Sequence, residues 1–407
     1  MKYLILVGDG MGDLPLPELD HRTPLEAAAT PALDSLCQKG ELFLTRTVPA
    51  GYPPGSDVAN LSLLGYRPEK YYTGRAPLEA ASMGIALAED ETAFRCNLVT
   101  LDRETAGKVQ MIDYAAGHIS SEESHQLLKA LETECSSDKF HFKPGISYRH
   151  ILIVKGDYPA FEPVPPHDHI EKDVTAPWLR YMADPQWKEL LNNACEVLTK
   201  HSVNQKRTAA NKKPANGIWL WGEGKLPSMP TFQERFGLQG SLISAVDLLK
   251  GLGVNAGLDI LNIPGATGYI DTNYKGKAEA ALKCLETQDF VFVHVEGPDE
   301  AGHQGLLQDK LQAIEDFDGQ IVAPIVQGLR DRGDDFRLIA TMDHYTPLSL
   351  RTHIDNPVPT ILYDSRELQQ GSGQTFSEKT GDATGKGEGA LTPDGETMLK
   401  KLLQQPL

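Results

Sequence analysis

Cysteine is scarce in this chain and shows no pattern. The cysteines in its 407 residues are Cys37, Cys96, Cys135, Cys195 and Cys284, and no two of them form a CxxC pair. An odd number at wide spacing, with no CxxC pair, argues against a disulfide framework. We therefore expect the protein to work in a reducing compartment, the cytoplasm.

Basic excess and long apolar runs are also missing. Lys and Arg total 39 against 56 Asp and Glu, which gives a formal charge of −17. This balance argues against nucleic acid or an anionic membrane surface as a partner. No segment approaches the roughly 18 apolar residues of a membrane span. The short N-terminal run YLILV (3–7) is followed at once by Asp9 and Asp13, with no small-residue cleavage site, so it predicts a buried strand rather than a signal peptide.

The two ends of the chain share an alternating strand and helix pattern. A chain of this length holds about two to three domains. The run 3–7 ends in a Gly-rich turn, which is typical of a central parallel strand with a site at its carboxyl end. Helical spacing or strand-like runs recur at 24–40, 43–49, 277–286, 289–297, 306–331, 336–344 and 358–364. We predict an α/β core with a central, mostly parallel sheet flanked by helices.

The middle of the chain has a different texture. Strand-like runs at 92–101, 108–114 and 147–156 mix with helical patterns at 120–133 and 187–203. We predict an inserted α+β domain over 72–240, with 1–71 and 241–407 forming a discontinuous core. The Lys/Asn-rich stretch 204–216 and the polar stretch 371–389 are expected to be loops, and the C-terminal TPDGETMLKKLLQQ a helix with Thr392 as possible N-cap.

Two stretches place reactive residue types on glycine turns. In VGDGMGD, Asp9 ends the first strand, and the flanking glycines allow a metal or phosphate to approach the backbone. In PPGSDVANLSLLGY, Ser56 stands just before a helix start, where amide groups favour an anion. Taken alone, the first is more often an ordinary Asp-Gly turn, and the second a helix cap.

Two further stretches combine carboxylates with histidines. In HVEGPDEAGHQG, Asp299 and His303 are four apart, so they share one face of a helical turn and can reach one cation. In ATMDHYTPLSLRTHIDNPVP, Asp343 and His344 end a strand and His353 follows nine residues later. A single histidine is more often structural, but three Asp and three His gathered mainly at strand ends favour a two-metal site.

The ordered set of these residues resembles the two-metal site of the alkaline-phosphatase superfamily. More closely, GDGMGD, PGSDVANLSLLGY, YYTGRAPLEAASMGI, FRCNLV, EGPDEAGHQG, MDH and RTHIDNPVP resemble the archaeal-type cofactor-independent phosphoglycerate mutases, over nearly the whole chain. The resemblance implies an alkaline-phosphatase-like core interrupted by a lid domain. It also implies interconversion of 2-phosphoglycerate and 3-phosphoglycerate without bisphosphoglycerate.

The same resemblance implies roles for the matching residues. Ser56 is expected to be the nucleophile that becomes phosphoserine, and it shares one metal with Asp9, Asp343 and His344. Asp299, His303 and His353 are expected to hold the second metal. A divalent cation favours the serine alkoxide and neutralises phosphoryl oxygens. The ligand types suit two Mn²⁺ ions, with Zn²⁺, Mg²⁺ and Co²⁺ also possible.

Substrate-binding residues match the family more loosely. The candidates for the grip on a small phosphorylated hydroxy acid are Arg75, His118, Arg149 and Lys250, and those for the base that activates its hydroxyl are Asp57 and Asp168. Surface charge is the ordinary alternative for the first four. The family's longer bacterial members carry an Arg-rich stretch where this chain has ANGIWLWGEGKLP, without arginine. Trp219 and Trp221 there are expected to be strand core.

Other functions of the same residues stay open at this point. One is a homoserine kinase-like phosphotransferase or a phosphatase acting through the same metal and serine site, although the sequence has no GxxxxGK[ST] motif. Another is a non-catalytic descendant that uses the fold for binding. Such a descendant usually loses its nucleophile or a ligand pair, and here Ser56 and all six Asp and His ligands are present.

Overall fold

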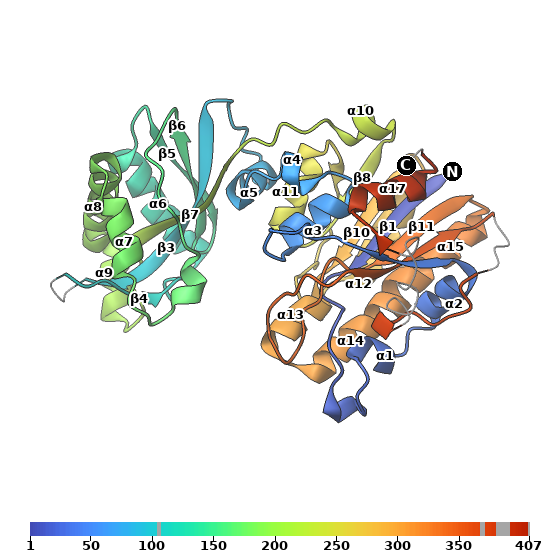
Figure 1. Cartoon of the computed structure of the whole chain (residues 1–407). Coiled ribbons are helices and arrows are strands. Elements are labelled where there is room, and N and C mark those ends of the chain that lie inside the picture. Colours follow the sequence, from blue (N-terminus) through green and yellow to red (C-terminus); the bar gives the residue numbers. More distant parts are fainter. Residues whose placement is uncertain (104–106, 367–370, 380–390, 406–407) are drawn as a thin grey trace. The chain divides into compact units, whose positions relative to one another are not determined.

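A computed structural model describes residues 1–407 except 104–106, 367–370, 380–390 and 406–407 (Figure 1). The chain divides into two compact units, which are described separately: Met1–Tyr72 with Ser228–Leu407, and Thr73–Pro227. The predicted insert 72–240 is therefore too long, because Tyr72 and residues 228–240 lie in the larger unit. The reason is packing: Phe232 is fully buried and its ring stacks on Phe290 of the core sheet at a centroid distance of 4.4 Å.

The larger unit alternates strands and helices. Its strands are β1 (Lys2–Gly8), β2 (Glu41–Thr45), β8 (Gly240–Ile243), β9 (Asp259–Ile260), β10 (Phe290–Val295), β11 (Phe336–Thr341), β12 (Val358–Asp364) and β13 (Leu391–Thr392). Its helices are η1 (Pro17–Leu19), α1 (Pro24–Ala27), α2 (Pro31–Lys39), α3 (Ser56–Leu63), α4 (Pro68–Tyr71), α10 (Phe232–Phe236), α11 (Asp247–Asn255), α12 (Tyr274–Cys284), α13 (Gly297–Gln304), α14 (Leu307–Asp316), the π-helical η3 (Phe317–Val322), α15 (Ala323–Arg332) and α17 (Gly395–Leu403).

The strands form an eight-stranded sheet in the order β13-β2-β12-β11-β1-β10-β8-β9. β1 lies between β10 and β11 and is parallel to both, whereas β12 is antiparallel to its neighbours β11 and β2. The predicted α/β core with a central, mostly parallel sheet is confirmed. Because parallel strands end at the same edge, the segments that follow β1, β10 and β11 meet there.

Helices cover both faces of this sheet, which explains the continuous apolar run at its centre. Alternate residues Leu4 and Leu6 of β1 belong to a core shared with α2, α12 and α15, while α3, α11 and α17 pack on the other face (Figure 1). Residues 4–8 of β1 are all buried. A strand buried on both faces has no polar alternation.

The smaller unit is an antiparallel sheet with helices. Its strands are β3 (Glu91–Asp102), β4 (Gln110–Asp113), β5 (Phe140–Ile146), β6 (Arg149–Lys155) and β7 (Gly217–Lys225), with β3 paired to β4, β6 and β7. Its helices are α5 (Arg75–Ser82), α6 (Ser121–Cys135), η2 (Pro166–His169), α7 (Thr175–Met182), α8 (Pro185–Lys200) and α9 (Ser202–Ala209). Trp219 and Trp221 of β7 are buried, as predicted.

Two local predictions were wrong. The stretch 204–216 is not all loop, because α9 extends into it and Arg207 is buried, donating to the carbonyl of Ala116 at 2.6 Å. Thr392 lies in β13 and does not cap the last helix. That cap is Asp394, which accepts from the amide of Thr397 at 2.7 Å. Most of the predicted loop 371–389 lies outside the described residues.

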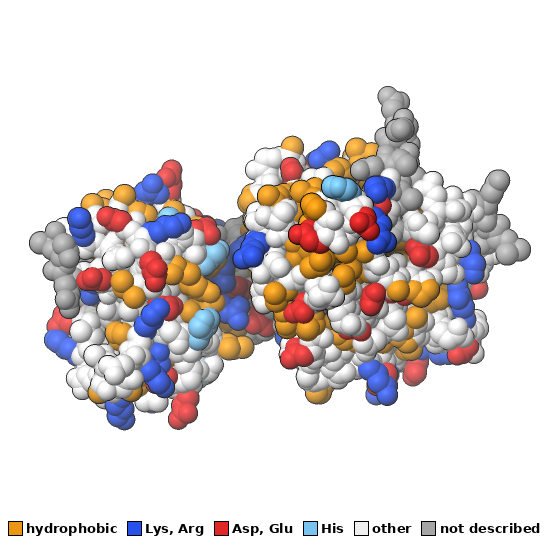
Figure 2. Space-filling view, turned by 90° about the horizontal axis from the view of Figure 1, so that it is seen from below, with side chains coloured by type: hydrophobic (Ala, Val, Ile, Leu, Met, Phe, Trp, Pro, Cys, Tyr) orange, Lys and Arg blue, Asp and Glu red, His pale blue; other side chains and the backbone are white. Residues whose placement is uncertain are grey.

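The last two features of the fold are the distribution of surface charge and the length of the apolar helices. On the face that Figure 2 shows, acidic and basic side chains are interspersed over each unit, so the charge of −17 is not gathered into one patch of that face. Among the described residues, no helix has the length and apolar character needed to cross a membrane.

Candidate active site

Side chains from three strand ends and two loops converge at the carboxyl edge of the core sheet. Asp9 follows β1, Asp299 lies in α13 just after β10, and Asp343 with His344 follows β11. Ser56 is the first residue of α3, and His353 comes from the loop before β12. The structure thus brings together all seven residues that the sequence analysis proposed for the nucleophile and the metal ligands, His303 of α13 included.

One group surrounds Ser56. Nε2 of His344 lies 3.2 Å from the Ser56 hydroxyl oxygen and 3.5 Å from carboxylate oxygens of both Asp9 and Asp343. Asp9, Asp343 and His344 are buried, at 2% exposure or less. The Asn60 amide donates to Asp343 at 2.8 Å, and so does the backbone amide of Gly10 at 3.1 Å. These two hydrogen bonds hold the Asp343 carboxylate in place, and their donors are not among the Asp and His side chains of the group.

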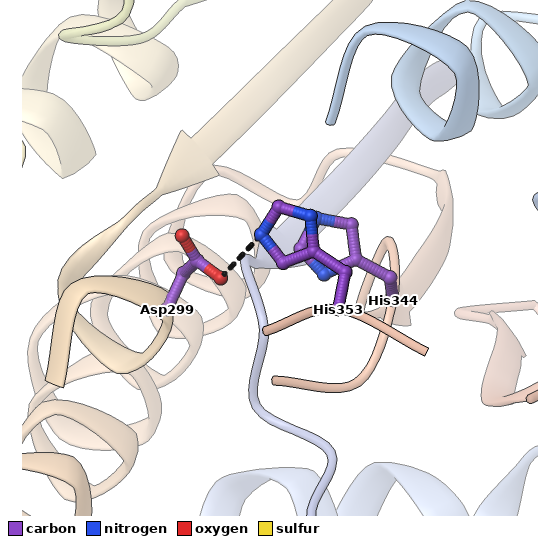
Figure 3. A group of neighbouring side chains, drawn as sticks. All are labelled: Asp299, His344 and His353. Atoms are coloured by element: carbon purple, nitrogen blue, oxygen red, sulfur yellow. Dashed lines mark ion pairs between the residues drawn. The ribbon is translucent and has the colours of Figure 1, made fainter. Parts of the chain in front are cut away.

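The second group consists of Asp299, His303 and His353. Nε2 of His303 lies 3.3 Å from Asp299, Nε2 of His353 lies 3.4 Å from it, and the two nitrogens are 2.8 Å apart. The His344 and His353 rings lie side by side at a centroid distance of 4.0 Å, which joins the two groups (Figure 3). Asp299, His344 and His353 therefore form one set of ligand atoms close enough for a cation.

The histidines of the second group are oriented by backbone carbonyls. Nδ1 of His303 lies 3.1 Å from the carbonyl oxygen of Arg351, and Nδ1 of His353 lies 3.3 Å from that of Pro54. A carbonyl only accepts, so Nδ1 carries the hydrogen in each ring. In the neutral ring, Nε2 then presents its lone pair toward Asp299. This is the second-shell arrangement found around metal-binding histidines.

The electrostatics of the cluster are those of a cation site. Burial raises the pKa of Asp9 well above its ordinary range, and the carboxylates of Asp343 and Asp299 add to the rise. Burial acts in the same direction on Asp343, but His344 and His294 outweigh it and hold its pKa below the ordinary value. When the His303 ring is protonated, its Nε2 donates to Asp299 instead, and this hydrogen bond raises the pKa of His303 to about 9. Like-charged carboxylates this close share protons unless a cation neutralises them.

His294 is a further member that sequence reasoning missed. It is fully buried on β10, with Nε2 3.1 Å from Asp9, and it groups with Asp9 and Asp343 as a second possible set of cation ligands. Its Nε2 and the Oδ1 of Asp9 are buried without a hydrogen-bond partner among the described residues. Unpartnered buried ligand atoms fit a metal ion between them. The available signal was a histidine inside an otherwise apolar strand, FVFVHV.

The remaining predicted residues divide between the two units. In the larger unit, Asp57 is buried and accepts from the Tyr72 hydroxyl at 2.5 Å, and Lys250 of α11 lies 3.5 Å from Asp247. Arg75, His118, Arg149 and Asp168 belong to the smaller unit.

Two of these smaller-unit residues, Arg75 and Arg149, lie near one buried arginine, Arg95 of β3. Burial lowers the pKa of Arg95, and the positive charges of Arg75 and Arg149 lower it further. His118 and Arg149 both contact the Tyr148 ring. Asp168 lies 3.7 Å from His167, whose pKa is lowered mainly by burial and also by the charge of Arg95.

Arg95 was also missed by sequence reasoning. β7 pairs with β3 so that Trp221 is opposite Arg95, and the guanidinium lies 3.9 Å from the Trp221 ring centroid. Glu79 holds the same guanidinium through two contacts of 3.0 Å. Arg95 of the neighbouring strand thus lies against the ANGIWLWGEGKLP stretch, which itself has no arginine.

Comparisons with known proteins point to one family. A family model described as 2,3-bisphosphoglycerate-independent phosphoglycerate mutase matches residues 37–204. The mutase of that name from Methanosarcina acetivorans is 50% identical over 93% of this chain and 95% of its own length. The probable 2,3-bisphosphoglycerate-independent phosphoglycerate mutase of Geobacter sulfurreducens is 47% identical over 100% of both chains.

Two solved structures have the same fold over the whole chain. The PH0037 protein from Pyrococcus horikoshii matches with a TM-score of 0.79 and 28% identity over 100% of this chain and 98% of its own. The cofactor-independent phosphoglycerate mutase from Thermoplasma acidophilum matches with a TM-score of 0.65 and 27% identity over 99% of each. With relatives up to 50% identical over nearly their full length, the chain belongs to the family of 2,3-bisphosphoglycerate-independent phosphoglycerate mutases.

Proposed function

We propose that this enzyme interconverts 2-phosphoglycerate and 3-phosphoglycerate through a phosphorylated Ser56, without bisphosphoglycerate. The observation that carries the proposal is the position of the Ser56 hydroxyl, 3.2 Å from His344 beside the Asp9 and Asp343 carboxylates. The names of the relatives favour this reaction over the homoserine kinase and phosphatase alternatives.

Two divalent metal ions fit the residues of the site. Asp9, Ser56, Asp343 and His344 would hold one ion, and Asp299, His303 and His353 the other; carboxylate and imidazole ligands suit Mn²⁺ best, with Zn²⁺, Mg²⁺ and Co²⁺ as alternatives. Bound ions supply charge neutralisation for the serine oxygen and for the phosphoryl oxygens. The unpartnered Oδ1 of Asp9 supports this assignment.

The chain's own groups supply the rest of the chemistry. Ser56 begins α3, where the first backbone amides of a helix have no partner inside it and point toward an anion. These amides bind phosphoryl oxygens while Ser56 carries the group. Asn60, one turn later, does not bind the phosphoryl group, because its side-chain amide already donates to Asp343 and to the carbonyl of Ser56.

A mutase must also hold the free glycerate until it takes the phosphoryl group back on its other hydroxyl. We assign this to Lys250 of the larger unit and to Arg75, His118 and Arg149 of the smaller unit, which acts as a lid that keeps water out. Asp57 and Asp168 are the two candidates for the base that takes the proton from the glycerate hydroxyl. Asp57 is adjacent to Ser56 in the chain and is buried, and Asp168 lies beside His167.

The proposed compartment rests on the state of the thiols. All five cysteines are free, and four of them are buried. A structure without disulfides suits a reducing environment, and we assign the enzyme to the cytoplasm.

The deciding experiment supplies Mn²⁺ and 3-phosphoglycerate and omits bisphosphoglycerate and ATP. Formation of 2-phosphoglycerate is followed by ³¹P NMR and, separately, through added enolase. We expect conversion that stops when a chelator removes the metal and returns when Mn²⁺ is restored. A protein that binds metal but converts no substrate contradicts the proposal.

A further inference from the structure

Lys310 is a fully buried lysine that the proposed chemistry does not use. It lies on α14, and its ammonium group donates to the Asp13 carboxylate at 2.7 Å and to the carbonyls of Thr346 and Gly12 at 2.8 and 3.2 Å. An ammonium group has three hydrogens, and three acceptors surround this one. All of them belong to the two loops that follow β1 and β11.

Asp13 completes the connection between these loops. Besides Lys310, its carboxylate accepts from the amide of Leu14 at 2.8 Å and from that of Leu348 at 3.1 Å. Asp13 is 2% exposed. The pair Asp13 and Lys310 therefore ties the loop after Asp9 to the loop after His344 without touching either ligand.

Thr346 carries this connection to the ligands themselves. Its amide donates to the carbonyl of Gly12 at 3.1 Å, and its hydroxyl donates to Oδ1 of Asp299 and lies 3.3 Å from Nδ1 of His344. A hydroxyl has one hydrogen, and an ionised carboxylate can only accept it. Thr346 consequently accepts the hydrogen of His344 Nδ1, and Nε2 of His344 keeps its lone pair on the side of Ser56.

Two glycines make room for Thr346. A Cβ at Gly10 would lie 2.5 Å from the Thr346 hydroxyl, and a Cβ at Gly302 would lie 2.5 Å from the Thr346 carbonyl oxygen, the same oxygen that Lys310 binds. The backbones of the β1 loop and of α13 thus approach this residue as closely as packing allows. This close packing leaves Thr346 no room to shift. Because the carbonyl and the hydroxyl belong to the same residue, a displacement of the carbonyl also displaces the hydroxyl.

We propose that Lys310 is a positioning residue for the metal centre: held by Asp13, it fixes Thr346, whose hydroxyl orients Asp299 and His344, one ligand from each of the two groups. The inference rests on the metal assignment made under the proposed function. It predicts that Lys310 affects metal affinity beyond its effect on folding, because outer-shell partners of metal ligands typically change affinity by about 10–100-fold.

The test compares Lys310→Met with a matched variant, Arg337→Met. Arg337 is also buried in the larger unit and paired with a buried carboxylate, that of Asp364 at 2.5 Å, but it lies on β11 at the end remote from Asp343 and contacts the carbonyl of Leu402 in α17. Both variants remove a buried cation from a buried carboxylate, so both should lose stability. Asp13 is then left without a cation, whereas Asp364 keeps its ion pair with Arg366 at 2.8 Å. Mn²⁺ binding is measured by the electron paramagnetic resonance of free Mn²⁺, at a temperature where circular dichroism shows each variant folded.

We expect Lys310→Met to bind Mn²⁺ about 10–100-fold more weakly than the wild type, and Arg337→Met to bind it normally despite a lower melting temperature. The double variant Asp13→Asn/Lys310→Met removes the orphaned charge, so it should recover stability while its metal affinity stays low. If Lys310→Met does not fold, this double variant carries the comparison. Thr346→Val should resemble Lys310→Met, and Thr346→Ser, which keeps the hydroxyl, should resemble the wild type.

Wild-type Mn²⁺ affinity in folded Lys310→Met or in the double variant overturns the inference. Equal weakening in Arg337→Met does so as well, since the effect would then follow from stability alone. A wild-type enzyme that binds Mn²⁺ but does not convert phosphoglycerate overturns the proposed function and leaves this metal readout intact. A wild type that binds no divalent ion overturns both.

Discussion

The hydroxyl oxygen of Ser56 lies 3.2 Å from Nε2 of His344, although 288 positions separate the two residues in the chain. Neither residue would do chemistry alone. A serine hydroxyl is a weak nucleophile at neutral pH and needs a base or a cation beside it. The contact places Ser56 at the group formed by Asp9, Asp343 and His344, and it leads directly to the first prediction.

Replacing Ser56 by alanine should abolish mutase turnover, by a factor on the order of 10⁴ or more, because no other group takes the phosphoryl at this position. Mn²⁺ affinity should stay within about tenfold of the wild type, because the Asp and His ligands remain. Steady-state assay and metal titration of the same preparation check both parts. Substantial activity in Ser56→Ala would show that the nucleophile is another residue.

Arg149→Gln should raise the KM for 3-phosphoglycerate by about 10–100-fold, because a charge-assisted hydrogen bond to a carboxylate or phosphate contributes about 1.5–3 kcal/mol. The same effect is expected for Arg75→Gln. The control is Arg180→Gln, since Arg180 lies in the same unit but is exposed and paired with Glu162. If all three variants keep the wild-type KM, neither Arg75 nor Arg149 binds substrate.

Glu378 should make the protein less stable as the pH rises. Burial raises the pKa of its carboxyl to about 7 from 4.5, against the hydrogen bond from Thr23. Between these values the native state binds more protons than the unfolded state, so this stabilising contribution is complete below pH 4.5 and is lost as the pH rises through 7. It amounts to about 3 kcal/mol.

Urea unfolding at intervals from pH 4.5 to 8 tests this dependence. The free energy of unfolding of the wild type should fall relative to that of Glu378→Gln over this range. The control Glu69→Gln removes an exposed carboxylate, 45% accessible, and should follow the wild type. Parallel curves for wild type and Glu378→Gln would contradict the raised pKa.

Phe232→Ala should destabilise the larger unit by about 3–5 kcal/mol, because it empties a fully buried ring site against Phe290. Hydrogen exchange should quicken in β1 and β10 while β3 of the smaller unit keeps its protection. The nearby control Leu226→Ala changes a 43% exposed side chain of the smaller unit and should have little effect. Faster exchange confined to β3 would place residue 232 with the insert.

Much of the site could be predicted because its parts are local. Asp299 and His303 share a helical turn by their spacing, Asp9 ends an apolar run, and Ser56 begins a helix after Gly55. The parallel sheet then brings these segments to one edge, as alternating strand and helix patterns indicate. The family followed from long motifs of the same kind.

The tertiary structure alone decided the partners of these residues. Lys310 stands in an amphipathic helix where a lysine is ordinarily solvated, and its burial depends on Asp13, 297 positions away. Arg95 meets Trp221 only through the register of β3 and β7. The Lys/Asn-rich stretch 204–216 has the composition of a loop, but its Arg207 is buried and donates to the carbonyl of Ala116.

The sequence by itself thus determined the fold class, and it indicated the residues that we propose as metal ligands and nucleophile. Only the tertiary structure decided how each ligand is held, through the Thr346 hydroxyl, the Asn60 amide and the carbonyls of Pro54 and Arg351. The physical reason is range. Helix spacing and strand alternation act over a few residues, whereas a buried hydrogen bond joins whichever distant donor and acceptor the packed core leaves side by side.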